Sequence, residues 1–403
     1  MSTDIRDIPE AHVDRALDLA YLAFHEKTGD ATRKRHREAL LRCERVGAYD
    51  DGEIVGFAAA HRLGLSVPGG ELPVAELDFV SVAPTHRRRG VLTGMMAGMW
   101  RRCAADGRPL ACLWASEDAI YGRFGFAPAT EAYSVEIDTT RPLGLRITPD
   151  RRPLRLLAPA DAVGVLAPLY EAGRARRGGR LSRDEAWWRR ALLSGDEDGD
   201  DGKDGPSRIV VLGDKGAPAA GYVVYRVGEK GVVTVGEMEA PDAPAAAALW
   251  SYLAAIDLTR KVRAWAVAPD DPLLHFAADR DQVRVTGRLP ALWLRLVDVA
   301  RALTARSWAV PADLVLEVRD AALPANAGRF RLTADPSGAT YEPSGDPADL
   351  ALDVRELAAC YLGGVPLRRL VRAGLAEERT PGAARSLDAA LETEYLPFAG
   401  DDF

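Results

Sequence analysis

Cysteine is scarce in this 403-residue chain, and its few cysteines show no pairing pattern. The four are Cys43, Cys103, Cys112 and Cys360, and no two of them form a Cys-x-x-Cys motif. Each lies in an otherwise apolar or helical run, which is typical of free thiols in a reducing cytosol. The six histidines also lack the two-ligand spacing of a metal-binding helix. We therefore expect a cytoplasmic protein without a disulfide framework and without a metal site.

Long apolar runs and excess positive charge are missing as well. No stretch approaches 18 uninterrupted apolar residues, and the charged N-terminus has no apolar segment of the kind that directs secretion. The net charge of −7 argues against a general nucleic-acid binder and mildly favours cationic partners. A single hydrophobic core stops growing at about 250–300 residues, so a chain of this length predicts two or three domains. The lack of a long apolar run predicts no membrane span.

The stretch from Glu76 to Met99 is the most informative part of the sequence. Alternating apolar residues predict a buried strand that ends at Pro84, and apolar residues recur at helical spacing after Gly90. Three arginines, residues 87–89, lie in the turn between them. The first N–H groups of a helix have no intrahelical partner and carry partial positive charge, so they can bind phosphate oxygens. The pattern predicts a pyrophosphate site between the strand and the helix.

Two motifs in this region resemble those of a known superfamily. Residues 87–92, Arg-Arg-Arg-Gly-Val-Leu, are similar to the coenzyme A signature of the GNAT N-acetyltransferases, Arg/Gln-x-x-Gly-x-Gly/Ala, with Leu92 at the departing last position. Residues 116–126, from Ser116 to Phe126, resemble the serine-to-tyrosine stretch that carries the general acid of these enzymes. With the chain length and a bare terminal Phe403, this combination resembles the enhanced intracellular survival (Eis) family, in which leucine occupies the position of Leu92.

The resemblance implies an α/β and α+β chain: tandem GNAT-like domains followed by a sterol-carrier-protein-like α+β domain. We place a first GNAT domain with the acetyl-CoA site at 1–145, a degenerate second copy at 146–289 and the carrier-like domain at 290–403. Hairpin turns are expected at 51–52 and 69–70, and an amphipathic helix at 296–303. The acidic run 195–205 is expected to be a solvated loop, because no glutamate closes it as in a calcium-binding loop.

The second copy echoes the first but lacks its basic turn. Strands are expected at 208–212, 219–228 and 232–239, and Ala240-Pro241 then repeats the Ala83-Pro84 step before a helix at 245–258. Where the first copy has three arginines, the second offers Asp242. We expect it to bind no coenzyme A and to shape the cleft instead.

Acetyl transfer to an amine requires a coenzyme site, a polarised carbonyl, a proton donor for the thiolate and a neutral amine. We expect the backbone of residues 88–93 to hold the pyrophosphate, and residues 80–82 to pair with the pantetheine amides and donate to the thioester oxygen. The expected coenzyme-binding residues are Val80, Ser81, Val82, Arg88, Arg89, Gly90, Val91, Leu92, Thr93, Ser116 and Glu117.

The resemblance implies that Tyr121 is the proton donor. A phenol with an ordinary pKa near 10 stays protonated at pH 7 and acts by hydrogen bonding as much as by donation. The resemblance also implies that the terminal carboxylate of Phe403 accepts the proton of the amine. From its chemistry alone that carboxylate is equally a counterion for an ammonium group.

The expected function is N-acetyltransfer from acetyl-CoA to a primary amine of a polycationic small molecule such as an aminoglycoside, by direct attack in a ternary complex. Phe24, Glu26, Phe79 and Asp401 are expected to line the amine pocket. The family implies a homohexamer. The alternatives are a protein or peptide lysine acetyltransferase and a non-catalytic lipid or amine binder.

Overall fold

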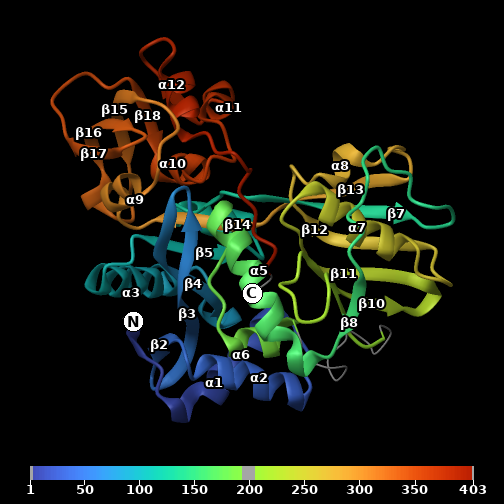
Figure 1. Cartoon of the computed structure of the whole chain (residues 1–403). Helices are drawn as coiled ribbons and strands as arrows, with labels where there is room; N and C mark the ends of the chain where they lie inside the picture. The colour runs from blue at the N-terminus through green and yellow to red at the C-terminus, as the bar shows by residue number, and fades with distance from the viewer. Residues whose placement is uncertain (1–2, 193–204, 402–403) are drawn as a thin grey trace. The chain divides into compact units, whose positions relative to one another are not determined.

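The computed structural model describes residues 3–192 and 205–401 (Figure 1). Its contacts group the described chain into two units. One comprises residues 3–130, 291–394 and Asp401, and the other comprises residues 131–290 and 395–400. Phe403 lies outside the described residues, as does most of the predicted loop at 195–205, of which only Gly205 is described. The predicted domain boundaries at 145 and 289 stay predictions.

Seven strands form the first sheet, in the order β1-β2-β3-β4-β5-β14-β6. They are β1 (Asp4–Asp7), β2 (Glu44–Asp50), β3 (Glu53–Val67), β4 (Gly70–Val82), β5 (Leu110–Trp114), β6 (Ala127–Pro128) and β14 (Leu292–Leu296). Both predicted hairpins are confirmed: β2 and β3 join at Asp51 and Gly52, and β3 and β4 join at Gly69, all three with positive φ. The parallel pair β4–β5 follows, and it brackets α3 as predicted.

Helices cover both faces of this sheet. α1 (Val13–Phe24) and α2 (Asp30–Leu40) lie on one side, where their apolar residues form a core with Tyr49, Phe57 and Ala59 of the strands. α3 (Val91–Asp106) packs on the other side through Met95, Met96 and Met99, and α4 (Asp118–Tyr121) follows β5 (Figure 1). The sheet is therefore covered on both faces, which explains why six consecutive residues of β3, 55–60, are buried.

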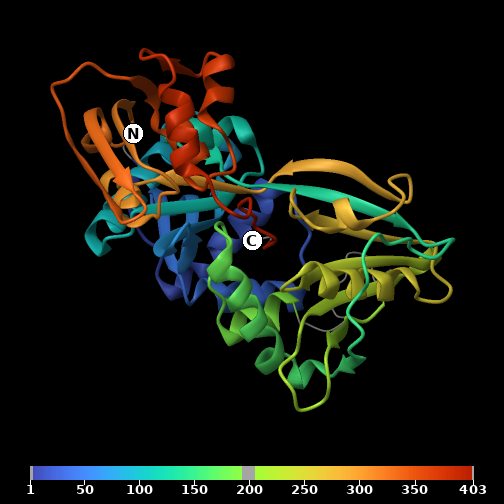
Figure 2. The same ribbon diagram turned by 45° about the horizontal axis from the view of Figure 1, so that its top comes forward.

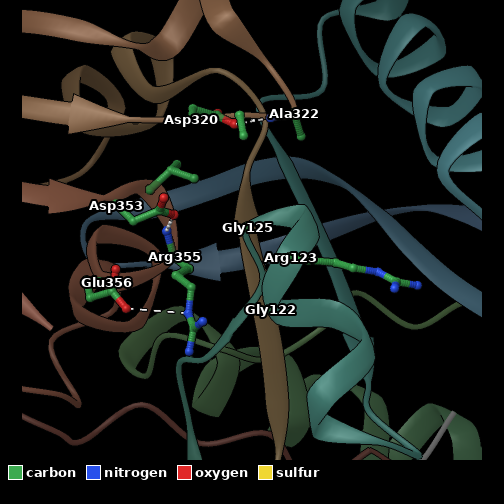
Figure 3. Close-up of a pocket in the computed structure, with 10 residues that line it drawn as sticks. Gly122, Arg123, Gly125, Asp320, Ala322, Asp353, Arg355 and Glu356 are labelled. Carbon is green, nitrogen blue, oxygen red and sulfur yellow. Dashed lines mark hydrogen bonds and ion pairs between the residues drawn. The ribbon is translucent and has the colours of Figure 1, made fainter.

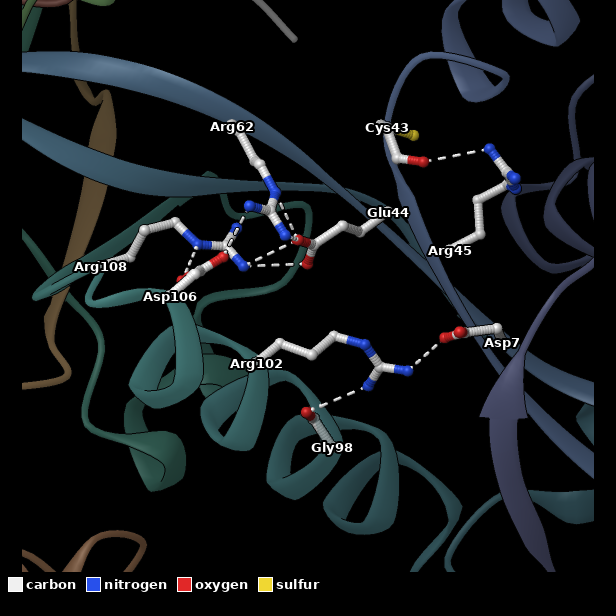
Figure 4. A network of polar contacts seen from close by, with 9 residues as sticks. All are labelled: Asp7, Cys43, Glu44, Arg45, Arg62, Gly98, Arg102, Asp106 and Arg108. Atoms are coloured by element: carbon white, nitrogen blue, oxygen red, sulfur yellow. Dashed lines mark hydrogen bonds and ion pairs between the residues drawn. The ribbon is translucent and has the colours of Figure 1, made fainter.

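An ion-pair network closes the end of the sheet at which β4 and β5 pair (Figure 4). The Arg108 side chain, 3% exposed, donates to Glu44 at 2.9 Å and to Asp106 at 2.9 Å, and Arg62 also pairs with both carboxylates. Nearby, Arg102 of α3 pairs with Asp7. These contacts fix the connection between α3 and β5, so the strands are held together at this end and are free to diverge at the other.

The second sheet also has seven strands, in the order β13-β7-β12-β11-β10-β9-β8. The strands are β7 (Glu131–Asp138), β8 (Leu154–Leu157), β9 (Arg208–Leu212), β10 (Tyr222–Gly228), β11 (Val232–Glu239), β12 (Lys261–Val267) and β13 (Val283–Pro290). The helices are α5 (Pro159–Arg176), α6 (Glu185–Trp187), α7 (Ala243–Ala254) and α8 (Leu273–Phe276). The parallel pair β11–β12 brackets α7, so the predicted repeat of the first motif is present.

A five-stranded sheet, in the order β17-β16-β15-β18-β19, forms the rest of the first unit. Its strands are β15 (Ala312–Arg319), β16 (Gly328–Asp335), β17 (Gly338–Pro343), β18 (Leu350–Asp353) and β19 (Ala376–Glu378). Its helices are α9 (Val299–Ala305), α10 (Val354–Tyr361), α11 (Leu367–Arg372) and α12 (Ala383–Leu391). Figure 2 shows α10, α11 and α12, in red, gathered beside the orange strands.

The predicted helix at 296–303 begins too early. Residues 292–296 form β14, which lies between β5 and β6 of the first sheet, and α9 begins only at Val299. All five residues of β14 are buried, including Arg295, so the strand has no polar face from which its period could be recognised. Its partners β5 and β6 lie about 165–185 residues earlier in the chain, which no local pattern can reveal.

Candidate active site

The site forms where β4 and β5 diverge. The two strands pair only from Val74–Leu110 to Glu76–Cys112, although β4 continues to Val82 and β5 to Trp114. The pairing of β4 with β3 shifts between Asp78 and Ser81, which marks a β-bulge. A bulge bends and twists its strand, and this one turns β4 away from β5. Within the described residues, β4 has no ladder pairing with β5 beyond Glu76, so its outer edge is available for an extended ligand.

Phe79 lies at the bulge with a positive φ of 52°, a conformation that is uncommon for a bulky residue. The Asp78 carboxylate stabilises it by accepting a hydrogen bond from the Phe79 N–H at 2.6 Å. The Phe79 ring stacks on Phe57 and meets His36 of α2 edge-on, with ring centroids 6.2 and 5.2 Å away. His36 in turn shares a 2.8 Å hydrogen bond with the hydroxyl of Tyr21. These four side chains form an aromatic group, a cluster that borders the bulge on the side of α1 and α2.

The N-terminus of α3 lies directly after the basic turn. Gly90 adopts a left-handed conformation with φ 81°, and among the described residues no side chain caps this helix end. Arg88 and Arg89 are exposed, and Arg88 also has a positive φ of 62°. Uncapped N–H groups beside exposed guanidinium groups match a pyrophosphate in both hydrogen bonding and charge. The pyrophosphate site itself stays a prediction.

The equivalent helix of the second sheet, α7, is capped at its N-terminus by the carboxylate of Asp242. The Asp242 side chain accepts a hydrogen bond from the N–H of Ala245 at 2.9 Å, at the start of α7. A carboxylate at this position takes up a donor that a phosphate would use and repels its negative charge. This difference supports a single coenzyme site, in the first copy.

Tyr121 ends α4 and is 5% exposed. Burial raises the pKa of its phenol to about 12, the charge of Asp78 adds to the rise, and a hydrogen bond with the Ser116 side chain opposes it. The assumption of an ordinary phenol pKa is therefore corrected, because the sequence does not show the desolvation. Ser116 and Glu117 are exposed on the turn between β5 and α4.

The predicted coenzyme residues of β4 divide between the two faces of the sheet. Val80 and Val82 pack against the core beneath α3, whereas Ser81 is buried and its hydroxyl has no hydrogen-bond partner in the described structure. Val91 is buried at the start of α3, Leu92 packs against the same core, and Thr93 is exposed. The groups on β4 that can pair with an extended amide chain are therefore the backbone N–H and C=O groups along its edge, and not these side chains.

The four predicted amine-pocket residues have different environments. Phe24 and Glu26 are exposed at the end of α1, and Phe79 is half-buried in the aromatic group. Asp401, in contrast, is 5% exposed, and its backbone carbonyl accepts a 2.5 Å hydrogen bond from the indole N–H of Trp114. The sequence analysis did not single out Trp114. Its place at the end of β5, two residues before Ser116, was the available signal.

In the second unit, the tail that precedes Asp401 is also held by backbone bonds. The N–H of Phe398 donates to the carbonyl of Gly178 at 3.0 Å, and the N–H of Leu396 donates to the Asp270 carboxylate at 2.8 Å. Arg177 pairs with the same carboxylate at 2.6 Å. Leu396 and Phe398 are thus held by specific hydrogen bonds as well as by apolar packing.

A cavity of about 260 Å³ lies beside the loop that follows Tyr121 (Figure 3). It is lined by Gly122, Arg123, Gly125, Asp320, Ala321, Ala322, Asp353, Val354, Arg355 and Glu356. Asp320 pairs with Arg295 at 2.6 Å, and both side chains are almost wholly buried. The Asp320 carboxylate also accepts hydrogen bonds from the N–H groups of Ala322 and Leu323. Its ion pair with Arg295 therefore connects the loop after β15 to β14 of the first sheet.

Within residues 3–192 and 205–401, no three or more His, Cys, Asp or Glu side chains lie close enough together to hold a metal ion. No helix in the same ranges has the length and apolar character that crossing a membrane requires.

Known proteins share this architecture. Residues 4–129 and 179–301 each match an acetyltransferase (GNAT) domain, and residues 299–400 match a sterol carrier protein domain. The N-acetyltransferase Eis of Mycobacterium tuberculosis is 35% identical over 87% of this chain and 86% of its own. The crystal structure of Eis1 from Mycobacterium abscessus superimposes with a TM-score of 0.87 at 33% identity over all of both chains.

The chain belongs to the Eis family of GNAT N-acetyltransferases. The predicted fold class, two GNAT domains followed by a sterol-carrier-like domain, is confirmed. An uncharacterized N-acetyltransferase of Streptomyces avermitilis, 38% identical over all of both chains, extends the same assignment. This Eis-family protein is therefore an acyltransferase, and GNAT acetyltransferases use acetyl-CoA as their co-substrate.

Proposed function

We propose that the protein transfers the acetyl group of acetyl-CoA to a primary amine of a polycationic small molecule of the aminoglycoside type. The observation that carries this proposal is the uncapped start of α3 beside the free edge of β4, with Tyr121 buried nearby. The net charge of −7 favours a cationic acceptor. The attack is direct in this proposal, because burial raises the pKa of the Cys112 thiol on β5 and keeps it protonated, whereas a covalent route through a cysteine requires the thiolate.

The coenzyme is held by backbone groups in this proposal. The N–H groups of residues 88–93 bind the pyrophosphate, with Arg88 and Arg89 supplying positive charge. The edge of β4 at residues 80–82 pairs with the pantetheine amides, and its N–H groups stabilise negative charge on the thioester oxygen. The Phe79 N–H already donates to Asp78, so we assign the oxygen-binding role to the next amide, that of Val80.

Tyr121 donates a hydrogen bond to the departing thiolate. With a pKa of about 12, its proton is retained throughout the physiological range. Full transfer to a thiolate with an ordinary pKa near 8.5 would be uphill by roughly 3.5 pKa units, about 5 kcal/mol. The buried phenol therefore acts mainly by stabilising the thiolate as its charge develops. The terminal carboxylate of Phe403 accepts the proton of the attacking amine, and Glu26 and Asp401 favour the cation.

The test is thiol release from acetyl-CoA with a panel of amines, including a kanamycin-type compound and a lysine peptide. Tyr121→Phe should lower kcat by about 10²–10⁴-fold with little change in KM. Tyr341→Phe is the matched control, because it removes a buried hydroxyl without a hydrogen-bond partner in the described structure. Activity on the peptide alone would favour the lysine acetyltransferase, and an unchanged kcat would remove Tyr121 from the mechanism.

A second pair of variants tests the terminal carboxylate. A C-terminal tag, or deletion of Phe403, should abolish turnover and leave acetyl-CoA binding intact, because each moves the carboxylate. Phe403→Ala keeps the carboxylate in place and should retain most of the activity. Full turnover in the tagged protein would exclude the carboxylate as the base.

Family resemblance also leads us to propose a homohexamer whose chain divides near residues 145 and 289 into two GNAT domains and a carrier-like domain. Sedimentation velocity tests the oligomeric state, since a monomer of 43.4 kDa is readily distinguished from a hexamer.

A further inference from the structure

The basic turn at 84–90, between β4 and α3, is exposed at every residue except His86. Before the turn, the N–H of Ala83 donates to the carbonyl of Val55 at 2.9 Å, and after it Val91 is buried at the start of α3. An exposed turn of this kind keeps one conformation only if a side chain fixes it. His86 is the residue of the turn that is placed to do so.

Both ring nitrogens of His86 make a hydrogen bond. Nδ1 lies 2.8 Å from the hydroxyl of Thr85, and Nε2 lies 3.1 Å from Oδ2 of Asp50. The side chains of His86 and Asp50 are 21% and 23% exposed, so the contact is partly screened from water. Because a carboxylate only accepts, Nε2 carries a proton and donates to Asp50, and Nδ1 of the neutral ring accepts from Thr85. The ring therefore satisfies both bonds without needing a charge.

Asp50 belongs to a well-fixed part of the first sheet. It is the last residue of β2 and pairs with Glu53 of β3 in the hairpin between them. In the part of the chain that the structure describes, the Asp50 carboxylate makes no hydrogen bond or ion pair other than that with His86. Since β3 separates β2 from β4 in the sheet, this bond ties the turn to a strand two places away from the one that leads into it.

The turn needs such support because its backbone path is strained. Arg88 and Gly90 have positive φ values of 62° and 81°. For an arginine this conformation is uncommon, and it persists only when the surrounding structure holds it. The arginines at 87–89 do not supply that support, because they are exposed and form no ion pair with any described residue. His86, two residues before Arg88, is the point at which the turn is held.

We infer that His86 is a positioning residue for the coenzyme: its bonds to Thr85 and Asp50 hold residues 87–90 in the conformation that receives the pyrophosphate of acetyl-CoA. The inference rests on the proposed function, in which this turn and the start of α3 bind the coenzyme. A turn that is fixed before binding loses less conformational entropy when the ligand arrives, so the pair strengthens coenzyme binding. His86 and Asp50 need no contact with the ligand for this role.

Asp50 gives the inference a sign opposite to that expected from charge. Removing an acid beside the turn weakens the repulsion of an anionic ligand, so electrostatics by itself predicts a lower KM for acetyl-CoA in Asp50→Ala. If Asp50 holds the turn through His86, the same substitution raises that KM. A hydrogen bond to a charged group shifts an equilibrium by about tenfold at the low end of its usual range, which sets the expected rise.

The experiment measures thiol release by His86→Ala, Asp50→Ala and the double variant, with the amine of the panel that reacts fastest. Two donors are compared. Acetyl-CoA carries the pyrophosphate, whereas S-acetylpantetheine carries the same thioester and pantetheine amides without it. His12→Ala is the matched control, because His12 is also half-buried and shares a 3.2 Å hydrogen bond with the hydroxyl of Tyr49, the neighbour of Asp50 on β2.

We expect each single variant to raise the KM for acetyl-CoA about tenfold and to leave kcat, and kcat/KM for S-acetylpantetheine, within about twofold. The double variant should be no worse than either single variant, because both remove the same bond. His86→Gln, which keeps one donor and one acceptor, should recover most of the loss. His12→Ala should change none of these values.

Two results would overturn the inference while leaving the proposed function intact. They are an equal loss with both donors in His86→Ala, which would make the residue merely structural, and an unchanged or lower KM for acetyl-CoA in Asp50→Ala. Failure of the proposed function is seen in the natural protein instead: equal kcat/KM for the two donors there would reject the pyrophosphate site itself.

Discussion

Gly125 offers a sharp test of how the Tyr121 loop is built. It has φ 84°, a conformation that side chains other than glycine disfavour. A Cβ added at this position would lie 2.1 Å from Nη1 of Arg295 and 2.9 Å from Cγ1 of Val354. Gly125→Ala must therefore strain the backbone and also displace a buried guanidinium group. Both costs follow from one methyl group.

The size of the effect can be bounded. The left-handed backbone costs an alanine about 1–2 kcal/mol, and overpacking a well-packed site costs about 1–3 kcal/mol. The expected loss of stability is thus about 2–5 kcal/mol. The upper value applies if Arg295 must leave Asp320, since breaking one partner from a buried ion pair costs about 3–5 kcal/mol.

Gly52→Ala is the matched control. Gly52 has φ 81°, and nothing lies within 4 Å of an added Cβ, so this variant incurs only the backbone cost. Chemical unfolding is followed by tryptophan fluorescence, and the transition midpoints of both variants are compared with that of the natural protein. Gly125→Ala should be less stable than Gly52→Ala by at least about 1 kcal/mol. Equal midpoints would refute the packing of Arg295 against the loop.

Two further predictions concern pH and helix capping. Because the pKa of Tyr121 is raised to about 12, the folded state retains a proton that the unfolded state loses near pH 10. The stability that this group contributes is fully present below pH 10 and is lost as the pH rises toward 12. Unfolding titrations should show this loss in the natural protein and a shallower one in Tyr121→Phe, and parallel curves would contradict the raised pKa. Asp242→Ala should cost about 1 kcal/mol through loss of the α7 cap, without changing the KM for acetyl-CoA; a clear change in that KM would place coenzyme at the second copy.

The sequence by itself determined the features that depend on neighbours in the chain. The strand, basic turn and helix from Glu76 to Met99 were recognisable because apolar period, proline and glycine mark their own boundaries. The tight turns at 51–52 and 69–70 followed from residues that tolerate positive φ. The repeat of strand and helix around Asp242 was readable for the same reason, including the acid that replaces the basic turn.

Tertiary structure alone decided the features that join distant segments. Strand β14 enters the first sheet from about 165–185 residues away, and its buried Arg295 is tolerated only because Asp320 meets it there. The bulge at Phe79 depends on pairing with β3, and the raised pKa of Tyr121 depends on how deeply the phenol is buried. The contact of Trp114 with Asp401 joins residues 287 positions apart. Local periodicity carries no information about such contacts, because hydrogen bonding and desolvation depend on which groups meet in space.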